Sequence, residues 1–138
     1  MSAEPEIGGH KYRFDPLDVF DQLDVARRLA PIVALLTMQK DREKLKSGFA
    51  RAFVSMSSGM SREDVRAVLA LCLAKVHRNQ AGNYAPVCPS GQIMFEDIDL
   101  PRSLELLWEV LARNKIIDFF DEPLSTSKGK REGGGKSG

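Results

Sequence analysis

Residues 99–120 read DLPRSLELLWEVLARNKIIDFF, and this stretch decides the fold class. Its large apolar residues recur at spacings of three and four, which is the helical period: Leu104, Leu107, Trp108 and Leu111. Asp99 stands where an N-cap carboxylate accepts hydrogen bonds from the first backbone amides of a helix. We therefore predict a helix that begins after Asp99, buries one apolar face and ends near Phe119-Phe120.

The N-terminal part of the chain contains a second pattern of this kind. Asp15-Pro16 is a typical helix start, because aspartate caps free amides and proline in the first turn loses no hydrogen bond. An apolar stripe at helical spacing follows: Val19, Leu23, Ala26, Ala30, Val33 and Leu36. This pattern predicts a helix over residues 16–37, which Pro31 should kink or divide.

Two more helices are predicted in the middle of the chain. The first runs from about Asp41 to Met56, where Ser57-Ser58-Gly59 ends it. The second opens at Ser61, whose hydroxyl is suited to cap it. Its predicted inner face comprises Val65, Val68, Leu69, Cys72 and Val76.

Short strands are predicted around these helices. Residues 11–14 alternate polar and aromatic side chains, which indicates a short strand. Turn-forming residues between 79 and 91 predict a loop or loose hairpin, with short strands near 84–87 and 92–95. The fold class is therefore predicted as mainly α: a small bundle of four to five helices, with a short N-terminal strand and a short hairpin near 84–95.

We expect one helical domain over residues 1–120, with residues 1–10 loose at its start. Residues 121–138 end in STSKGKREGGGKSG, which buries too little apolar surface to offset the entropy of ordering, so we expect a disordered tail. Gly135-Lys136-Ser137 resembles the end of a phosphate-binding loop, but the first glycine of that motif would fall on Lys130. No nucleotide or other cofactor is therefore predicted.

Composition excludes several classes of function. Twenty Lys and Arg against 19 Asp and Glu give 138 residues a net charge of +1, which provides no long-range attraction to nucleic acid or anionic membranes. Two cysteines and two histidines do not supply the paired ligands of a structural zinc site, so no metal is predicted. The N-terminal segment lacks an apolar signal region and no apolar run reaches the ~20 residues of a membrane span, which predicts a cytoplasmic protein.

Three groups of residues are candidates for a catalytic or nucleic-acid-binding site. Glu96, Asp97 and Asp99 cluster, but acids favour helix starts, so capping explains them better than acid–base catalysis. Cys88 with His77 leaves a cysteine enzyme as a less favoured alternative. A small helical DNA-binding regulator, with a helix–turn–helix over the second and third predicted helices, is the other alternative. It would use basic residues that are interleaved with acids: Lys40, Arg42, Lys44, Lys46 and Arg51.

One apolar stripe is a candidate for binding a partner. It combines phenylalanine and methionine at helical spacing: Phe49, Phe53, Met56 and Met60. Such stripes are more often core, but methionine and phenylalanine together also make adaptable grooves for partner helices. We therefore hypothesise that this stripe is partly exposed. As a functional class, the residues favour a protein that binds other proteins over an enzyme.

Two stretches resemble the small tail assembly chaperones of tailed bacteriophages and prophages. Residues 12–36, YRFDPLDVFDQLDVARRLAPIVALL, resemble their N-terminal block, and residues 91–120 resemble their C-terminal block. The matching points are Phe20-Asp21-Gln22, the segment Ala26-Arg27-Arg28-Leu29-Ala30-Pro31, Met94-Phe95-Glu96-Asp97-Ile98, Trp108 and Phe119-Phe120. The family offers no motif of functional residues to carry over.

The resemblance implies a helical, non-catalytic protein that acts in the host bacterial cytoplasm during tail morphogenesis. Such chaperones are thought to coat the long helical tape measure protein, keep it soluble and help to deliver tail tube subunits. They are absent from the finished particle. The resemblance therefore implies that the stripe binds the tape measure protein, with the tail tube protein as a second partner. Neither nucleic acid nor a membrane is an expected partner.

Overall fold

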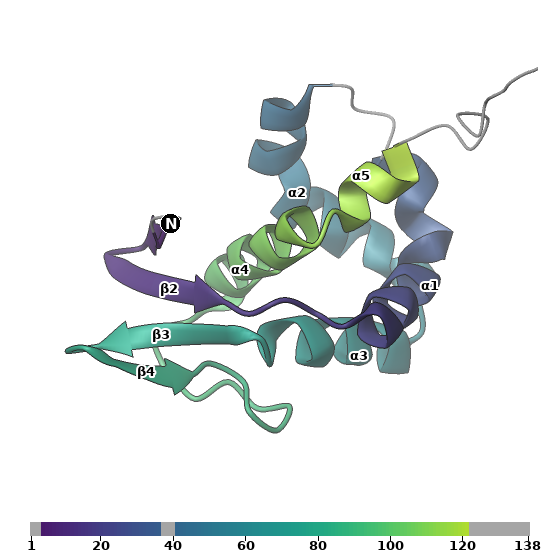
Figure 1. The fold of residues 1–138 in the computed structure, drawn as a ribbon. Coiled ribbons are helices and arrows are strands. Elements are labelled where there is room, and N and C mark those ends of the chain that lie inside the picture. Colours follow the sequence, from purple (N-terminus) through teal and green to yellow (C-terminus); the bar gives the residue numbers. More distant parts are fainter. Residues whose placement is uncertain (1–3, 37–40, 122–138) are drawn as a thin grey trace, which may run out of the picture.

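The computed structural model describes residues 4–36 and 41–121. Within these residues it contains a four-stranded antiparallel sheet, five α-helices and one 3-10 turn (Figure 1). In chain order the elements are β1 (Glu6–Ile7), β2 (His10–Phe14), α1 (Val19–Leu36), α2 (Arg42–Met56), the 3-10 turn (Ser57–Gly59), α3 (Arg62–Leu73), β3 (Val76–Gln80), β4 (Asn83–Pro86), α4 (Leu100–Arg113) and α5 (Ile116–Asp121).

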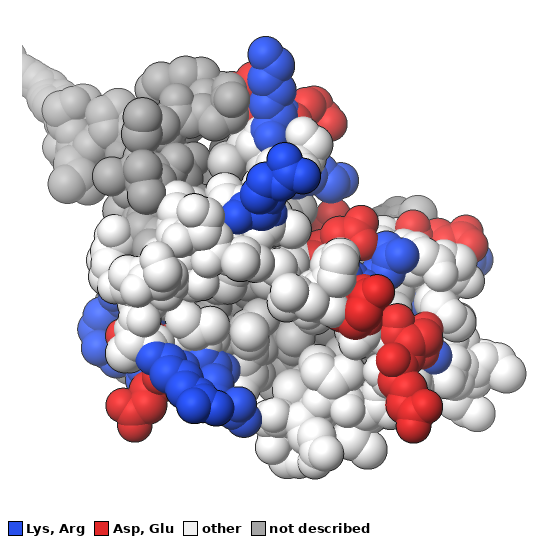
Figure 2. All heavy atoms as spheres, turned by 180° about the vertical axis from the view of Figure 1, so that it is seen from behind, with Lys and Arg blue, Asp and Glu red and all other residues white. Residues whose placement is uncertain are grey.

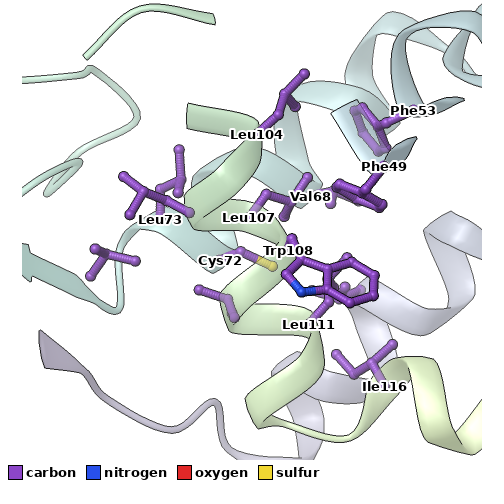
Figure 3. Packing of buried hydrophobic residues seen from close by; sticks show 14 of the residues in the cluster. Phe49, Phe53, Val68, Cys72, Leu73, Leu104, Leu107, Trp108, Leu111 and Ile116 are labelled. Atoms are coloured by element: carbon purple, nitrogen blue, oxygen red, sulfur yellow. The ribbon is translucent and has the colours of Figure 1, made fainter. Parts of the chain in front are cut away.

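Helix α4 is the centre of the core, and α2, α3 and α5 pack against it (Figures 1 and 3). The predicted apolar face of this helix is confirmed, since Leu104, Leu107, Trp108 and Leu111 are all buried. Leu106 and Val110 are buried as well, so that α4 is covered on more than one side. Asp99 caps the helix as predicted, because its carboxylate accepts the Arg102 backbone amide at 3.0 Å.

The predicted end of this helix near Phe119-Phe120 is wrong. The helix stops at Arg113, and a separate helix α5 begins at Ile116. Lys115 lies between them with φ +60°, a left-handed conformation that ends a helix. The Asn114 side chain accepts the backbone amide of Leu17 at 2.9 Å, which joins this break to the segment before α1. The break turns α5 so that Ile116 and Ile117 are buried.

Helices α2 and α3 begin where the sequence predicts. The Asp41 carboxylate accepts the backbone amide of Glu43 at 2.9 Å, and the Ser61 hydroxyl accepts that of Asp64 at 3.0 Å. Helix α3 is shorter than predicted, however, because it ends at Leu73. Val76, which was expected on its inner face, is buried as the first residue of strand β3.

Helix α1 presents a different face to the core from the one predicted. It runs from Val19 to Leu36 with Pro31 inside it, so that the proline does not divide it. Among the side chains described in this helix, residues 19–31, Val25 and Leu29 are buried, whereas Val19 and Leu23 of the predicted stripe are exposed. Apolar residues occur on several faces of this helix, and the contact with α3 decides which face is covered. The predicted cap is also wrong, because Asp18 accepts the amide of Asp21 at 2.8 Å.

The sheet has the strand order β1-β2-β3-β4, with every neighbouring pair antiparallel. Strand β2 confirms the strand predicted at 11–14. The strand predicted near 84–87 is confirmed as β4, but it pairs with β3 around Ala81-Gly82, and residues 92–95 form no strand. Residues 6–10, expected to be loose, form β1 and a turn to β2. The fold is therefore mainly α with a sheet, not a pure helix bundle, and the tail at 122–138 lies outside the described residues.

The β3–β4 turn is a place where the protein can be stabilised. Ala81 has φ +54° and Gly82 has φ +95°, a two-residue turn for which Asn-Gly is the preferred sequence. Asparagine adopts left-handed φ more readily than alanine, so Ala81→Asn should raise the free energy of unfolding by about 0.5–1 kcal/mol. Thermal unfolding should then shift upward by about 2–5 °C. The matched variant Ala81→Val should lower it, because a β-branched residue is strained there. Equal melting temperatures for both variants would contradict this.

Candidate interaction surface

The stripe predicted to be exposed is mostly part of the core. Phe49 is 1% exposed, Phe53 is 3% and Met60 is 9%, so the expected exposure is wrong at these three positions, while Met56 is half-buried. The cause is the packing of α2 on α4: the ring of Phe49 lies 5.3 Å from the Trp108 ring and 5.6 Å from that of Phe53 (Figure 3). Direct contact of Phe49 or Phe53 with a partner would require the core to open.

A different pair of helices exposes large apolar side chains. We call the surface made by Val19, Phe20 and Leu23 of α1 and Phe119 of α5 the α1–α5 surface. These side chains are 73%, 80%, 64% and 59% exposed, respectively. Large apolar side chains clustered at the surface of a folded domain mark sites of interaction with proteins or membranes. This surface is therefore the best candidate for partner binding among the described residues.

A shallow groove of about 240 Å³ runs through this surface between the two helices. Its lining is largely apolar, with Val19, Leu23 and Ala26 on α1 opposite Ile116 and Phe119 on α5. The polar lining residues are Gln22, Asn114 and Lys115. A groove with apolar walls and few charges suits the apolar face of a helix.

Partly buried hydrogen bonds hold the two walls of this groove in place. Gln22 donates from its side-chain amide to the backbone carbonyl of Leu17 at 2.9 Å. Asn114 accepts the amide of the same residue and donates from Nδ2 to the carbonyl of Val110 at 2.8 Å. The start of α1 and the break before α5 are thus tied to one point of the chain. Both walls of the groove belong to the stretches that resemble tail assembly chaperones, since Val19 and Leu23 lie within residues 12–36 and Phe119 within residues 91–120.

The arrangement around Cys88 does not activate a nucleophile. Cys88 is buried against α3, and burial raises the pKa of its thiol despite a hydrogen bond from the Gly91 backbone. Cys72 is buried more deeply, which raises its pKa to about 12, with Asp21 as a smaller cause. A catalytic cysteine needs a lowered thiol pKa, and His77 lies instead 3.5 Å from the Asp15 carboxylate. The raised thiol pKa of Cys88 and the pairing of His77 with Asp15 give no support to the cysteine-enzyme alternative.

The acidic cluster has structural partners. Asp99 caps α4 as expected, and Asp97 accepts two hydrogen bonds from Arg78 Nη1, at 3.0 and 2.8 Å. The hydrogen bond from Arg78 lowers the pKa of Asp97, with burial opposing it. Arg78 itself is buried on β3, and its guanidinium lies 4.0 Å from the centre of the Phe95 ring. Arg78 and Asp97 therefore join the sheet to the segment that leads into α4.

The basic residues of the DNA-binding alternative do not form an uninterrupted positive face. Lys44 and Arg51 are exposed on α2, but Lys46 lies 3.6 Å from Glu109. Lys40 and the side chain of Arg42 lie outside the described part. Figure 2 shows acidic side chains among the basic ones on the face that carries much of α2, together with broad areas that carry no charge. Such a mixture weakens attraction to phosphates.

Residues 4–36 and 41–121 contain neither a cluster of metal ligands nor a membrane-spanning helix. No group of three or more histidine, cysteine, aspartate or glutamate side chains in this part is arranged to hold a metal ion. None of the helices described there has the length and apolar content needed to cross a bilayer.

The comparison with known families supports the resemblance in the sequence. A family model described as phage tail assembly chaperone protein, TAC, matches residues 8–126. Neither a curated protein nor a solved structure matches the chain. The family match includes every described helix and strand except β1, and both walls of the α1–α5 surface. The chain therefore belongs to the phage tail assembly chaperone family.

Proposed function

We propose that this protein binds the tape measure protein in the cytoplasm of the host during tail assembly, and that its α1–α5 surface makes the contact. The observation that carries the proposal is the exposure of Val19, Phe20, Leu23 and Phe119 around one apolar groove. A tape measure helix exposes apolar side chains until the tail tube encloses it. Covering them with a second apolar surface removes both surfaces from water, which favours binding.

The proposal also explains why the surface remains exposed in the folded chain. Each large apolar side chain buried at an interface contributes about 1–3 kcal/mol, so the exposed residues of α1 and α5 suffice for a reversible complex. A chaperone must release its client, which a modest interface permits. We propose further that the protein supports assembly of the tail tube around the tape measure protein, and that it is absent from the mature virion.

The test is co-expression with the tape measure protein of the same phage. The tagged wild-type chain should capture that protein and keep it in the soluble fraction. Replacing Phe20 and Leu23 together by serine should raise the Kd at least about 30-fold, because two exposed apolar side chains no longer contribute to the interface. Titration of the purified tape measure protein measures this value.

Val54→Ser is the matched control, because Val54 is half exposed but lies on α2, outside the α1–α5 surface. It should bind like the wild type. Full capture by the Phe20/Leu23 variant, or an equal loss with Val54→Ser, would refute the assignment of the surface. A shift of DNA mobility by the wild-type chain at ~150 mM salt would favour the DNA-binding alternative instead.

A further inference from the structure

Among the described residues that line the groove of the α1–α5 surface, Lys115 alone is charged. It lies at the break between α4 and α5, where the hydrogen bond from Leu17 to Asn114 brings the start of α1 close. Lys115 therefore marks the end of the groove at which both helices begin. It is exposed, as are Val19 and Leu23 on the opposite wall.

The charge of Lys115 is not used inside the protein. In the described part of the chain, Lys115 forms no ion pair. The other cation near this break differs, because Arg113 pairs with Glu109 at 3.2 Å and lies over the ring of Phe14. Asp118, one turn further along α5, is half-buried and does not line the groove. The ammonium group of Lys115 therefore stands beside apolar walls without a carboxylate of its own.

The aspartates of α1 do not line the groove either. Asp24 is held by two arginines of its own helix, Arg27 at 2.6 Å and Arg28 at 3.2 Å. Asp18 accepts the backbone amide of Asp21 at 2.8 Å and so serves the start of α1. These carboxylates leave the cation of the groove without direct compensation.

The backbone holds Lys115 in one place. Its amide donates to the carbonyl of Ala112 at 3.1 Å, and its carbonyl accepts the amide of Phe119 at 2.9 Å. Its φ of +60° is a left-handed conformation, for which glycine is the usual residue at the end of a helix. Glycine would form this turn with less strain, so the backbone alone does not require a lysine here.

We propose that the α1–α5 surface recognises helical segments in which an acidic residue flanks one end of an apolar stripe, and that Lys115 determines this preference. The inference rests on the proposed function and names the chemistry of the segment bound there. The apolar side chains of the segment would lie in the groove, and its carboxylate would pair with the Lys115 ammonium group where α1 begins. Charge complementarity selects this segment, because a lysine at the same place would be repelled. The described lining has no charge at the other end, so the ion pair also fixes the direction of the segment.

Three synthetic helical peptides with the same leucine stripe test this preference. They carry glutamate, glutamine or lysine next to one end of the stripe, and fluorescence anisotropy follows the binding of each labelled peptide to the full-length protein. The glutamate peptide should bind about three-fold more tightly than the glutamine peptide and about ten-fold more tightly than the lysine peptide, as one exposed ion pair and its replacement by repulsion predict. These differences should shrink at ~1 M salt, because the charges are then screened.

Substitutions of Lys115 separate its charge from its place in the fold. Lys115→Gln should bind the glutamate and glutamine peptides equally, and Lys115→Glu should prefer the lysine peptide. Lys115→Gly should also lose the preference, yet unfold at no lower a temperature than the wild type, because glycine adopts a left-handed conformation without strain. A merely structural role would not separate binding from stability in this way. Lys44→Gln is the matched control, since it removes a charge from an exposed position on α2 and should keep the preference.

The outcomes distinguish this inference from the proposed function. If the wild-type chain binds all three peptides with the same Kd, or if Lys115→Glu still prefers glutamate, the inference is wrong while the groove remains the binding surface. If the Phe20/Leu23 serine variant binds the peptides as tightly as the wild type, they bind elsewhere. That result would overturn both the inference and the assignment of the α1–α5 surface.

Discussion

Replacing Trp108 by alanine should lower the free energy of unfolding by about 3–5 kcal/mol, the largest effect of any single substitution considered for this protein. Trp108 is buried on α4, and its ring packs against Phe49 of α2 at 5.3 Å. The substitution removes the side chain that fills the space between these helices, and the cavity left behind adds to the lost burial. Such a loss is a large fraction of the 5–15 kcal/mol typical of a domain of this size.

Urea unfolding followed by circular dichroism measures this loss, because the variant lacks the fluorescent side chain. Trp108→Phe should cost clearly less, since a second aromatic ring still meets Phe49. Leu100→Ala is the control on the same helix, because Leu100 is exposed, and it should change stability by less than about 0.5 kcal/mol. If Leu100→Ala and Trp108→Ala lower stability equally, then α4 is not the centre of the core.

Arg78→Ala should cost about 2–4 kcal/mol, although it removes a charged residue from a strand. Arg78 is 5% exposed, donates to both carboxylate oxygens of Asp97 and stacks on Phe95. Alanine removes the stacked surface and the hydrogen bonds together, and it leaves the segment that leads into α4 without its tie to the sheet. Urea unfolding at neutral pH measures the change. Arg13→Ala is the control, because Arg13 is an exposed arginine on β2 that also stacks on a ring, that of Tyr84.

The same contact predicts a dependence of stability on pH. The hydrogen bond from Arg78 lowers the pKa of Asp97 in the folded state, so the ionised carboxylate binds more tightly than the protonated one. The stabilisation by this hydrogen bond is therefore complete above about 3.9, the pKa of an aspartate carboxyl in the unfolded chain. It is lost as the pH falls through the lower pKa that Asp97 has in the folded protein. Asp97→Asn should be less stable than the wild type at pH 6, and the difference should narrow below about pH 4. A constant difference across this range would contradict the assignment.

Local signals in the sequence predicted the starts of α2, α3 and α4, but not the cap of α1. Ser61 and Asp99 cap the helices that they were expected to cap, because the hydrogen bond from a side chain to an amide three residues later is local. The core face of α4 was also predictable, since polar residues on its remaining face leave one apolar stripe. In α1 the same reasoning chose the wrong face, because apolar residues occur on several sides of that helix and periodicity alone does not rank them.

The α1–α5 surface was not predicted from the sequence, for the same reason. The Phe49 stripe and the exposed residues of α1 both consist of large apolar side chains on a helix, and periodicity does not say which of them another element covers. Only the packing of α2 on α4 buries Phe49, and only the contact of α1 with α3 turns Phe20 outward. Phe20 and Phe119 both lie in the stretches that resemble the family, but the resemblance does not indicate that the fold places their helices side by side.

The sequence by itself therefore determined the caps of α3 and α4, the start of the central helix, the mainly helical composition and the family, because each depends on residues close together in the chain or on their order. The tertiary structure decided which apolar face is buried, where α4 breaks and which side chains share a groove. These features depend on contacts between elements far apart in the sequence, such as Asn114 with Leu17. Whether a side chain is buried depends on which other element of the fold packs over it, and a single segment of sequence does not specify that element.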